Sequence, residues 1–141
     1  MKVEKRCIED IAPYEDNPRE NDEAVDAVAD SLREFGFRQP IVVDPDGVIV
    51  CGHTRYKAAR QLELERVPVH VAEGLTQEQI RAYRIADNAT RDLSDWDYEL
   101  LPLEIGALED EGFDLGLLGF GPEALSGILD GEPAEGETDP D

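Results

Sequence analysis

The sequence predicts an α+β fold: a small mixed β-sheet with surrounding helices, followed by a C-terminal helical extension. Three observations lead to this fold class. Short apolar runs bounded by glycine, proline or aspartate, such as Ile41–Val43, are typical of strands. Segments of helical period lie between them, with capping residues at their starts and glycine at their ends. The length of 141 residues suits one domain with a modest core and an appendage.

The first expected helix covers residues 22–35. Asn21 or Asp22 is a good N-cap, the apolar positions of the segment fall on one face, and Gly36 is a usual stop. Before this helix, two prolines within residues 13–19 exclude regular helix.

A β-hairpin is expected next. The apolar runs 41–43 and 48–50 flank the turn sequence Asp44–Gly47, a pattern typical of two antiparallel strands. Gly52 breaks the second run, and a basic, alanine-containing helix is expected to follow it to about Leu64. A strand that turns through glycine into a helix leaves free backbone N–H groups and a positive dipole end at one place.

This strand–glycine–helix junction is a candidate anion site. Arg55 and Lys57 lie beside the free N–H groups, with His53 as a third candidate, and such a place suits a phosphate. An ordinary junction whose basic residues are solvated is the alternative, and the residues of the junction alone favour it.

Further elements follow along the chain. A third strand is expected at 67–71, and the capping box Thr76–Gln79 starts a helix that reaches Asn88. Additional helices are expected from Ser94 to Gly112 and over 122–129. In the helix that reaches Asn88, the residues expected to face the core are Ile80, Tyr83 and Ile85. The helix from Ser94 to Gly112 has two apolar faces that are expected to face the core. One is formed by Trp96, Leu100 and Leu103, and the other by Leu101, Ile105 and Leu108.

These elements predict a domain at 1–92, a helical extension at 93–130 and a tail at 131–141. The tail is rich in acids and has no aromatic residue, so it is expected to be disordered.

Charge is distributed unevenly around a net value of −21. All 13 lysines and arginines lie at or before Arg91, and the 16 acidic residues from Asp92 onward have no base among them. Such a surface repels nucleic acid, which argues against a free-standing DNA binder. Salt adaptation of the proteome is an alternative origin of the acidity.

The remaining composition excludes several classes. No apolar run is long enough for a bilayer and the N-terminus lacks a signal-peptide core, so a cytoplasmic location is expected. The two cysteines, Cys7 and Cys51, are too few for a disulfide framework and lack metal-type spacing.

Four motifs follow one another along residues 5 to 100. They are Asn17-Pro18-Arg19, the helix-to-strand passage 31–43, Gly52-His53-Thr54-Arg55 with the basic helix behind it, and Ala86-Asp87-Asn88-Ala89-Thr90-Arg91-Asp92-Leu93. In this order they resemble the ParB-like N-terminal (ParB-type nuclease) domain of the ParB/sulfiredoxin superfamily, of the kind associated with DNA methyltransferases.

The resemblance implies a nucleotide site. ParB partition proteins bind CTP with magnesium, and the phosphates lie at their arginine box, Gly-Glu-Arg-Arg, which Gly52-His53-Thr54-Arg55 resembles. By this resemblance the phosphate- and nucleotide-binding residues are Gly52, His53, Thr54, Arg55, Arg19 and Arg91. The implied metal ligands are Asp87 and Asn88, whose oxygens suit a Mg²⁺ bound with a nucleoside triphosphate, CTP or ATP.

The box departs from the family pattern in ways that bear on activity. His53 and Thr54 stand where partition proteins usually have Glu and Arg, which leaves the preferred base and hydrolysis open. Sulfiredoxin has its cysteine directly after the box glycine, whereas Cys51 precedes Gly52, so sulfiredoxin activity is disfavoured. A free-serine kinase branch has Gly-His-x-Arg, as here, and phosphoryl transfer therefore stays open.

The segment after the domain resembles the continuation of ParB-like domains found ahead of, or fused to, DNA methyltransferases. No helix-turn-helix DNA reader is expected in it, in keeping with the missing bases after Arg91. The sequence therefore predicts a nucleotide-binding regulatory module of a DNA modification or segregation system. A DNA methyltransferase or other DNA-processing protein is the expected partner, DNA contact is weak or indirect, and a homodimer stays open. The alternative is an enzyme of the same superfamily: a nuclease, an NTPase or a free-amino-acid kinase.

Overall fold

The computed structural model describes residues 1–15, 22–92 and 96–130, so the predicted tail lies outside the described residues. The chain divides into two compact units, Met1–Leu93 and Ser94–Asp141. No helix in the described ranges is long and apolar enough to cross a membrane.

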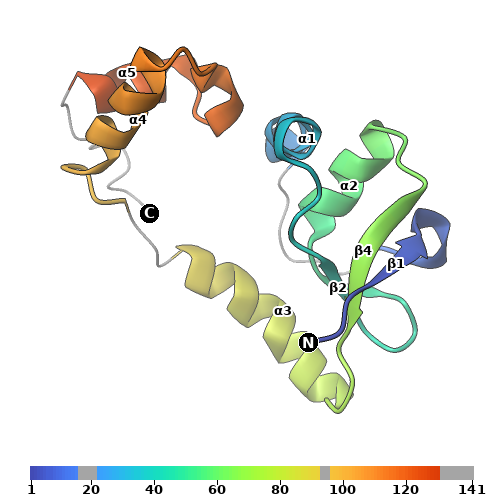
Figure 1. Cartoon of the computed structure of the whole chain (residues 1–141). Coiled ribbons are helices and arrows are strands. Elements are labelled where there is room, and N and C mark those ends of the chain that lie inside the picture. The colour runs from blue at the N-terminus through green and yellow to red at the C-terminus, as the bar shows by residue number, and fades with distance from the viewer. Residues whose placement is uncertain (16–21, 93–95, 131–141) are drawn as a thin grey trace. The chain divides into compact units, whose positions relative to one another are not determined.

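The first unit is built on a mixed four-stranded sheet in the order β1-β4-β2-β3. Strand β1 (Glu4–Cys7) pairs antiparallel with β4 (Arg66–Val71), and β4 runs parallel to β2 (Ile41–Val43). Strand β2 pairs antiparallel with β3 (Ile49–Cys51), as the predicted hairpin requires. Figure 1 shows β1, β4 and β2 beside one another. The α+β fold class predicted from the sequence is therefore confirmed.

Asp44 holds the turn of the hairpin. Its Oδ1 accepts hydrogen bonds from the backbone N–H groups of Asp46 and Val48, each at 2.9 Å. Gly47 has a φ of +87°, in the left-handed region that glycine adopts at no steric cost. This Asx-type turn fixes the start of β3 and therefore the position of the glycine that follows it.

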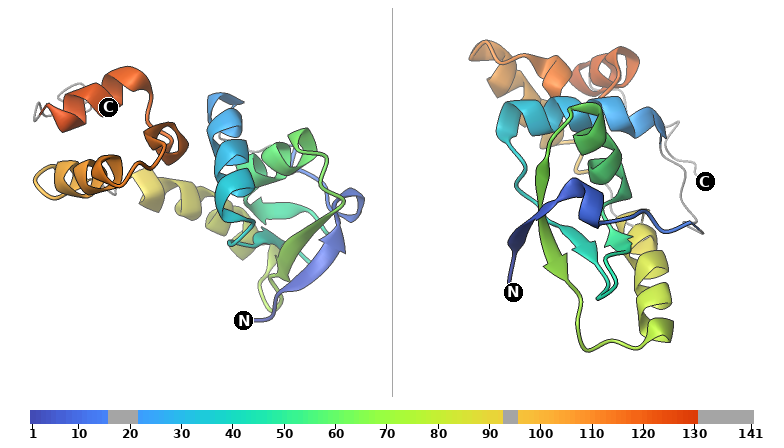
Figure 2. Two further views of the ribbon diagram at one scale, coloured as in Figure 1. Left: turned by 45° about the horizontal axis from the view of Figure 1, so that its top comes forward. Right: turned by 90° about the vertical axis from the view of Figure 1, so that its right-hand side faces the viewer.

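Helix α2 (His53–Gln61) packs against the sheet, and α1 (Asp22–Phe35) packs against α2 (Figure 2). Ala59 of α2 lies in the core with residues of β2, β3 and β4 and of the segment that follows β1. The buried members of this core are Ile8, Ile11, Ile41, Val43, Ile49, Ala59, Val67 and Val69. The α1–α2 contact buries Val25, Ala29 and Ala58. Close approach of the helices follows from the two alanines at this contact.

Helix α3 (Gln77–Asp92) starts at the predicted capping box. The Thr76 Oγ1 accepts from the Gln79 N–H at 3.0 Å, and the Gln79 Oε1 accepts from the Thr76 N–H at 2.9 Å. Ile80 then packs on Val50 and Cys51 of β3. The helix is thereby fixed beside the strand that leads into Gly52.

The buried face of α3 differs from the prediction. Tyr83 and Ile85 were expected to face the core, but both side chains are exposed, Ile85 to 61%. Ile80 and Arg84 are buried instead. These two residues are four positions apart and share one face of the helix. An arginine therefore lies on the buried face of α3, where the sequence analysis expected Tyr83 and Ile85 beside Ile80.

The second unit is helical. It contains α4 (Leu101–Asp110), a short 3-10 turn at Leu115–Leu118 and α5 (Pro122–Leu129). Ile105 of α4 and Ile128 of α5 are buried, and the two helices contact each other. The first helix was expected from Ser94, which lies outside the described residues, but α4 begins at Leu101. Ahead of it, the Asp97 Oδ1 accepts from the backbone N–H groups of Glu99 and Leu100, at 2.9 and 3.1 Å.

Candidate functional site

A cavity of about 520 Å³ lies at the junction of β3 and α2. It belongs entirely to the first unit, and its wall includes residues of α1 from Ala24 to Phe35 and the residues Asp87 and Asn88 of α3. Most of the predicted site residues line it, namely Gly52, His53, Thr54, Arg55, Asp87 and Asn88. Two motifs that are more than thirty residues apart in the sequence therefore meet in one hollow.

Gly52 makes the strand-to-helix turn. Its φ of 105° and ψ of 25° lie in the left-handed region, and it is the N-cap of α2. A Cβ at this position would lie 3.3 Å from the Ile41 Cγ1 and 3.4 Å from both the Ile41 Cα and the Arg55 Nη2. No side chain caps the N-terminus of α2 and its first turn contains no acid. The positive end of the helix therefore lies at the cavity with no acid in its own first turn.

We expect Gly52→Ala to lower the free energy of unfolding of the first unit by about 2 kcal/mol, because alanine resists the backbone angle and crowds Ile41. Gly74→Ala is the matched control: Gly74 has a φ of +85°, but nothing lies within 4 Å of its would-be Cβ. It should cost about 1 kcal/mol. Urea unfolding of both variants measures the difference, and equal losses would show that the contact with Ile41 costs nothing.

Arg55 places a positive group at the same end of the helix. Its Nη1 donates to the Gln39 Oε1 at 3.2 Å, and its Nη2 donates to the Pro40 carbonyl oxygen at 3.4 Å. Both acceptors belong to the segment that enters β2. The guanidinium is therefore held at the cavity wall by the chain opposite α2, a position from which it can meet an anion.

His53 is almost fully buried, with an exposed fraction of 8%. Its Nε2 accepts a hydrogen bond from the Tyr14 backbone N–H at 3.1 Å, so the neutral ring carries its proton on Nδ1. Burial lowers the pKa of His53 to about 4, helped by the positive charges of Arg84 and Lys57. His53 is therefore neutral in the folded protein and does not supply the third positive charge considered for the junction.

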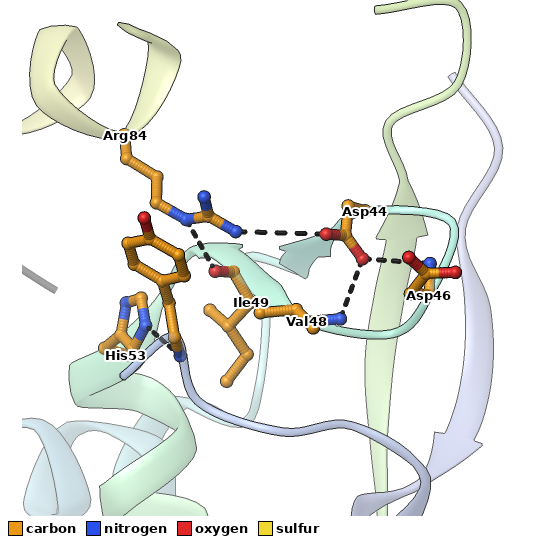
Figure 3. A network of polar contacts seen from close by, with 7 residues as sticks. Asp44, Asp46, Val48, Ile49, His53 and Arg84 are labelled. Atoms are coloured by element: carbon orange, nitrogen blue, oxygen red, sulfur yellow. Dashed lines mark hydrogen bonds and ion pairs between the residues drawn. The ribbon is translucent and has the colours of Figure 1, made fainter. Parts of the chain in front are cut away.

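Arg84 is the residue of this region that sequence reasoning missed. Its side chain is 5% exposed, and its Nε donates to the Ile49 carbonyl oxygen at 3.0 Å. Its Nη2 lies 4.0 Å from the Asp44 Oδ2, and its Cζ lies 3.6 Å from the centroid of the Tyr14 ring. Figure 3 shows Arg84 between the hairpin turn and the group around His53.

Tyr14, in the loop after β1, is held by two residues, and we call this pair of contacts the clamp around Tyr14. Arg84 stacks on the ring of Tyr14 while His53 accepts from the backbone of the same residue. One signal could have revealed it: Arg84 follows Ile80 by four residues on the inner face of the predicted helix.

Asp87 and Asn88 lie near the end of α3, and both side chains are partly buried. The Asn88 Nδ2 donates to the Arg84 carbonyl oxygen at 3.1 Å, which leaves the amide oxygen as the atom suited to a cation. Within the described ranges, no group of three or more His, Cys, Asp or Glu residues could hold a metal ion. A Mg²⁺ here would therefore need oxygens from a bound phosphate besides these two side chains, and Mg²⁺ commonly binds in this way.

The side chains of two predicted phosphate-binding residues, Arg19 and Arg91, lie outside the part of the chain that the structure describes. Arg19 lies outside the described residues. Arg91 is in the last turn of α3, but its side chain is likewise outside the described part of the chain. Both stay predictions.

Comparison with known proteins now identifies the class. Residues 2–89 match the ParB N-terminal domain, and residues 99–141 match the ParB-methyltransferase HTH domain. The chain belongs to the ParB N-terminal domain family. Because the second match is to a helix-turn-helix domain, the expectation that no such unit follows the first domain was wrong.

Relatives of known name agree with this assignment. The chain is 38% identical over 80 residues to the ParB-like nuclease domain-containing protein YnaK of Escherichia coli, covering 56% of this chain and 92% of that protein. It is 33% identical over 150 residues to the chromosome-partitioning protein Spo0J of Thermus thermophilus, covering 91% of this chain. The match spans 55% of the Thermus protein's own length.

A solved structure has the same fold. It is the C-terminally truncated chromosome-partitioning protein ParB of Caulobacter crescentus complexed with CTP-gamma-S, with a TM-score of 0.71. The superposition covers 97% of this chain and 89% of that one at 24% identity.

Proposed function

We propose that the first unit binds a nucleoside triphosphate with Mg²⁺, CTP in the first place, as the regulatory module of a DNA modification or segregation system. One observation carries the proposal: residues Gly52–Arg55 and the pair Asp87–Asn88 line the same cavity. An uncapped helix N-terminus and an arginine are the groups that proteins use for phosphate, and carboxylate and amide oxygens are ligands of hard cations.

Each residue has a role in this proposal. The backbone N–H groups at the start of α2 and the guanidinium of Arg55 hold the phosphates. Asp87 and the Asn88 amide oxygen hold Mg²⁺ together with phosphate oxygens. The cytosine base is proposed because the Caulobacter ParB of the same fold was crystallised with a CTP analogue. ATP is the alternative nucleotide.

The family match of the second unit supports the proposal that the protein has a partner in DNA modification. Its match is to a domain described for ParB-methyltransferase proteins, so we propose a DNA methyltransferase, in the same or another chain, as the partner. A unit without lysine or arginine from Asp92 onward attracts DNA poorly, and we propose that contact with DNA is indirect.

Titration of CTP, ATP, GTP and UTP with Mg²⁺, followed by thermal unfolding, tests the nucleotide site. CTP in large excess over its Kd should stabilise the first unit by about 2–4 kcal/mol. Arg55→Ala should weaken binding by about tenfold or more, since it removes a charge-assisted contact.

Arg60→Ala is the matched control, because Arg60 is an exposed arginine in the last turn of the same helix, stacked 5.8 Å from the centroid of Tyr56. It should bind nucleotide like the wild type. Absence of protection by every nucleotide, or equal binding by Arg55→Ala, would refute the site. Nucleotide turnover with and without DNA or free serine separates the module from an enzyme.

A further inference from the structure

Helix α4 has two apolar faces, and only one of them is buried. Ile105 packs inside the second unit, with Leu101 and Leu108 partly buried beside it. The sequence predicted that the other face is core as well, but this expectation was wrong. Leu100, the N-cap of α4, is 58% exposed and Leu103 is 69% exposed. A helix that is apolar on opposite faces normally packs against something on both of them.

The exposed face forms a continuous stripe. Leu100, Leu103 and Ala107 are spaced three and four residues apart, so they lie along one side of the helix, and all three are exposed. Trp96 is exposed as well, and its ring lies 5.6 Å from the ring of Phe120. We call Leu100, Leu103 and Ala107 the α4 stripe. Single exposed leucines need no explanation, whereas two leucines and an alanine in line on a small unit, with an exposed tryptophan in the same unit, are typical of a contact surface.

The charge around the α4 stripe restricts what can cover it. Glu99 and Glu104 are exposed beside it, and no lysine or arginine occurs from Asp92 to the last residue. A helix-turn-helix domain that reads DNA contacts the phosphates through lysine and arginine, which this one lacks. A second copy of the same unit would bring acid against acid. The complementary surface is therefore apolar at its centre and basic at its rim.

We propose that the α4 stripe docks a protein partner through an apolar patch bordered by lysine and arginine. In this unit the helix-turn-helix scaffold serves protein recognition and not DNA reading. The leucines supply the buried apolar contact, and the surrounding acids select and orient the basic partner. The surface lies in the second unit and does not depend on nucleotide binding in the first.

Trp96 is the only tryptophan of the chain, so its fluorescence reports on this unit in the intact protein. The probe is a synthetic amphipathic helix of leucine and lysine, compared with the same pattern carrying glutamate for lysine and with one carrying glutamine for leucine. Saturable binding with a blue shift of the Trp96 emission is expected for the leucine/lysine helix alone.

The double variant Leu100→Ser, Leu103→Ser should weaken this binding by about tenfold or more, because two apolar contacts are lost. Ile85→Ser is the matched control, since Ile85 is equally exposed but lies on α3 of the first unit. It should leave the affinity unchanged. Circular dichroism verifies that both variants keep their helices.

Several results would overturn the proposal. If the helix with glutamate bound as tightly as the leucine/lysine helix, the partner would not be selected by charge. If the helix with glutamine bound as tightly, the binding would not depend on apolar contact. Undiminished binding by the double variant would place the probe elsewhere. A dimer that the double variant dissociates would assign the surface to a second copy of the chain. Trp96 shielded from acrylamide in the monomer, and unshielded in the double variant, would show that the chain itself covers the stripe.

Discussion

Replacing Arg84 with methionine is expected to lower the free energy of unfolding of the first unit by about 3 kcal/mol. The guanidinium donates to the Ile49 carbonyl oxygen at the start of β3, faces Asp44 in the hairpin turn and stacks on Tyr14. Methionine fills much of the space of arginine but offers no donor. The Ile49 carbonyl oxygen would then lose this donor and Asp44 its positive neighbour, in a place that water reaches poorly.

Urea unfolding followed by circular dichroism measures this loss. Trp96 belongs to the second unit, so its fluorescence follows that unit separately. Arg81→Met is the matched control: Arg81 is an exposed arginine of α3, three residues before Arg84, and its replacement should change stability by less than about 0.5 kcal/mol. If the two variants were equally stable, the clamp around Tyr14 would contribute nothing to the fold.

The elements that sequence reasoning located correctly carry local signals. The hairpin has a turn with Asp44 and Gly47, α3 has the capping box Thr76–Gln79, and Gly52 has a left-handed backbone angle that favours glycine. Each signal acts within a few residues, so it can be read without knowledge of the tertiary contacts. That Gly52–Arg55 and Asp87–Asn88 belong to one site was implied only by the resemblance to a family, and the structure places both motifs at one cavity.

The elements that were missed depend on distant partners. Strand β1 is a polar run, Glu4-Lys5-Arg6-Cys7, and forms at the edge of the sheet by pairing with β4. Arg84 is buried because a carbonyl of β3 and the ring of Tyr14 are there to receive it. The helix-turn-helix unit was excluded on its charge, but charge governs DNA affinity, whereas the packing of apolar residues such as Ile105 and Ile128 determines the fold.

Stability of the first unit is expected to fall by about 2–3 kcal/mol as the pH is lowered from 6.5 towards 4, through His53. The pKa of His53 is lowered from 6.5 to about 4 in the folded protein. Between these two pH values His53 is mostly protonated in the unfolded chain and mostly neutral in the folded chain. The contribution of His53 is therefore fully present above pH 6.5 and is lost as the pH falls through this window.

His53→Gln isolates this effect, because Gln retains an acceptor for the Tyr14 N–H but does not titrate. Carboxylates also take up protons in the lower part of the window, so the quantity to compare is the difference in unfolding free energy between wild type and variant at each pH. His70→Gln, which removes the chain's other histidine, is the control. An NMR titration of the His53 ring should give a midpoint near 4; a midpoint near 6.5 would contradict its burial and the influence of Arg84.

The same pKa separates the charge of His53 from the proposed nucleotide site. Above pH 6 the ring is neutral in the folded protein, so in the proposed site Arg55 and the helix end would supply the positive charge for phosphate. Nucleotide affinity of the wild type should therefore show no step from His53 between pH 6 and 8. In Arg84→Met the pKa of His53 should rise, because a neighbouring positive charge is gone. As the pH is lowered, the nucleotide affinity of this variant should therefore begin to change at a higher pH than the affinity of the wild type.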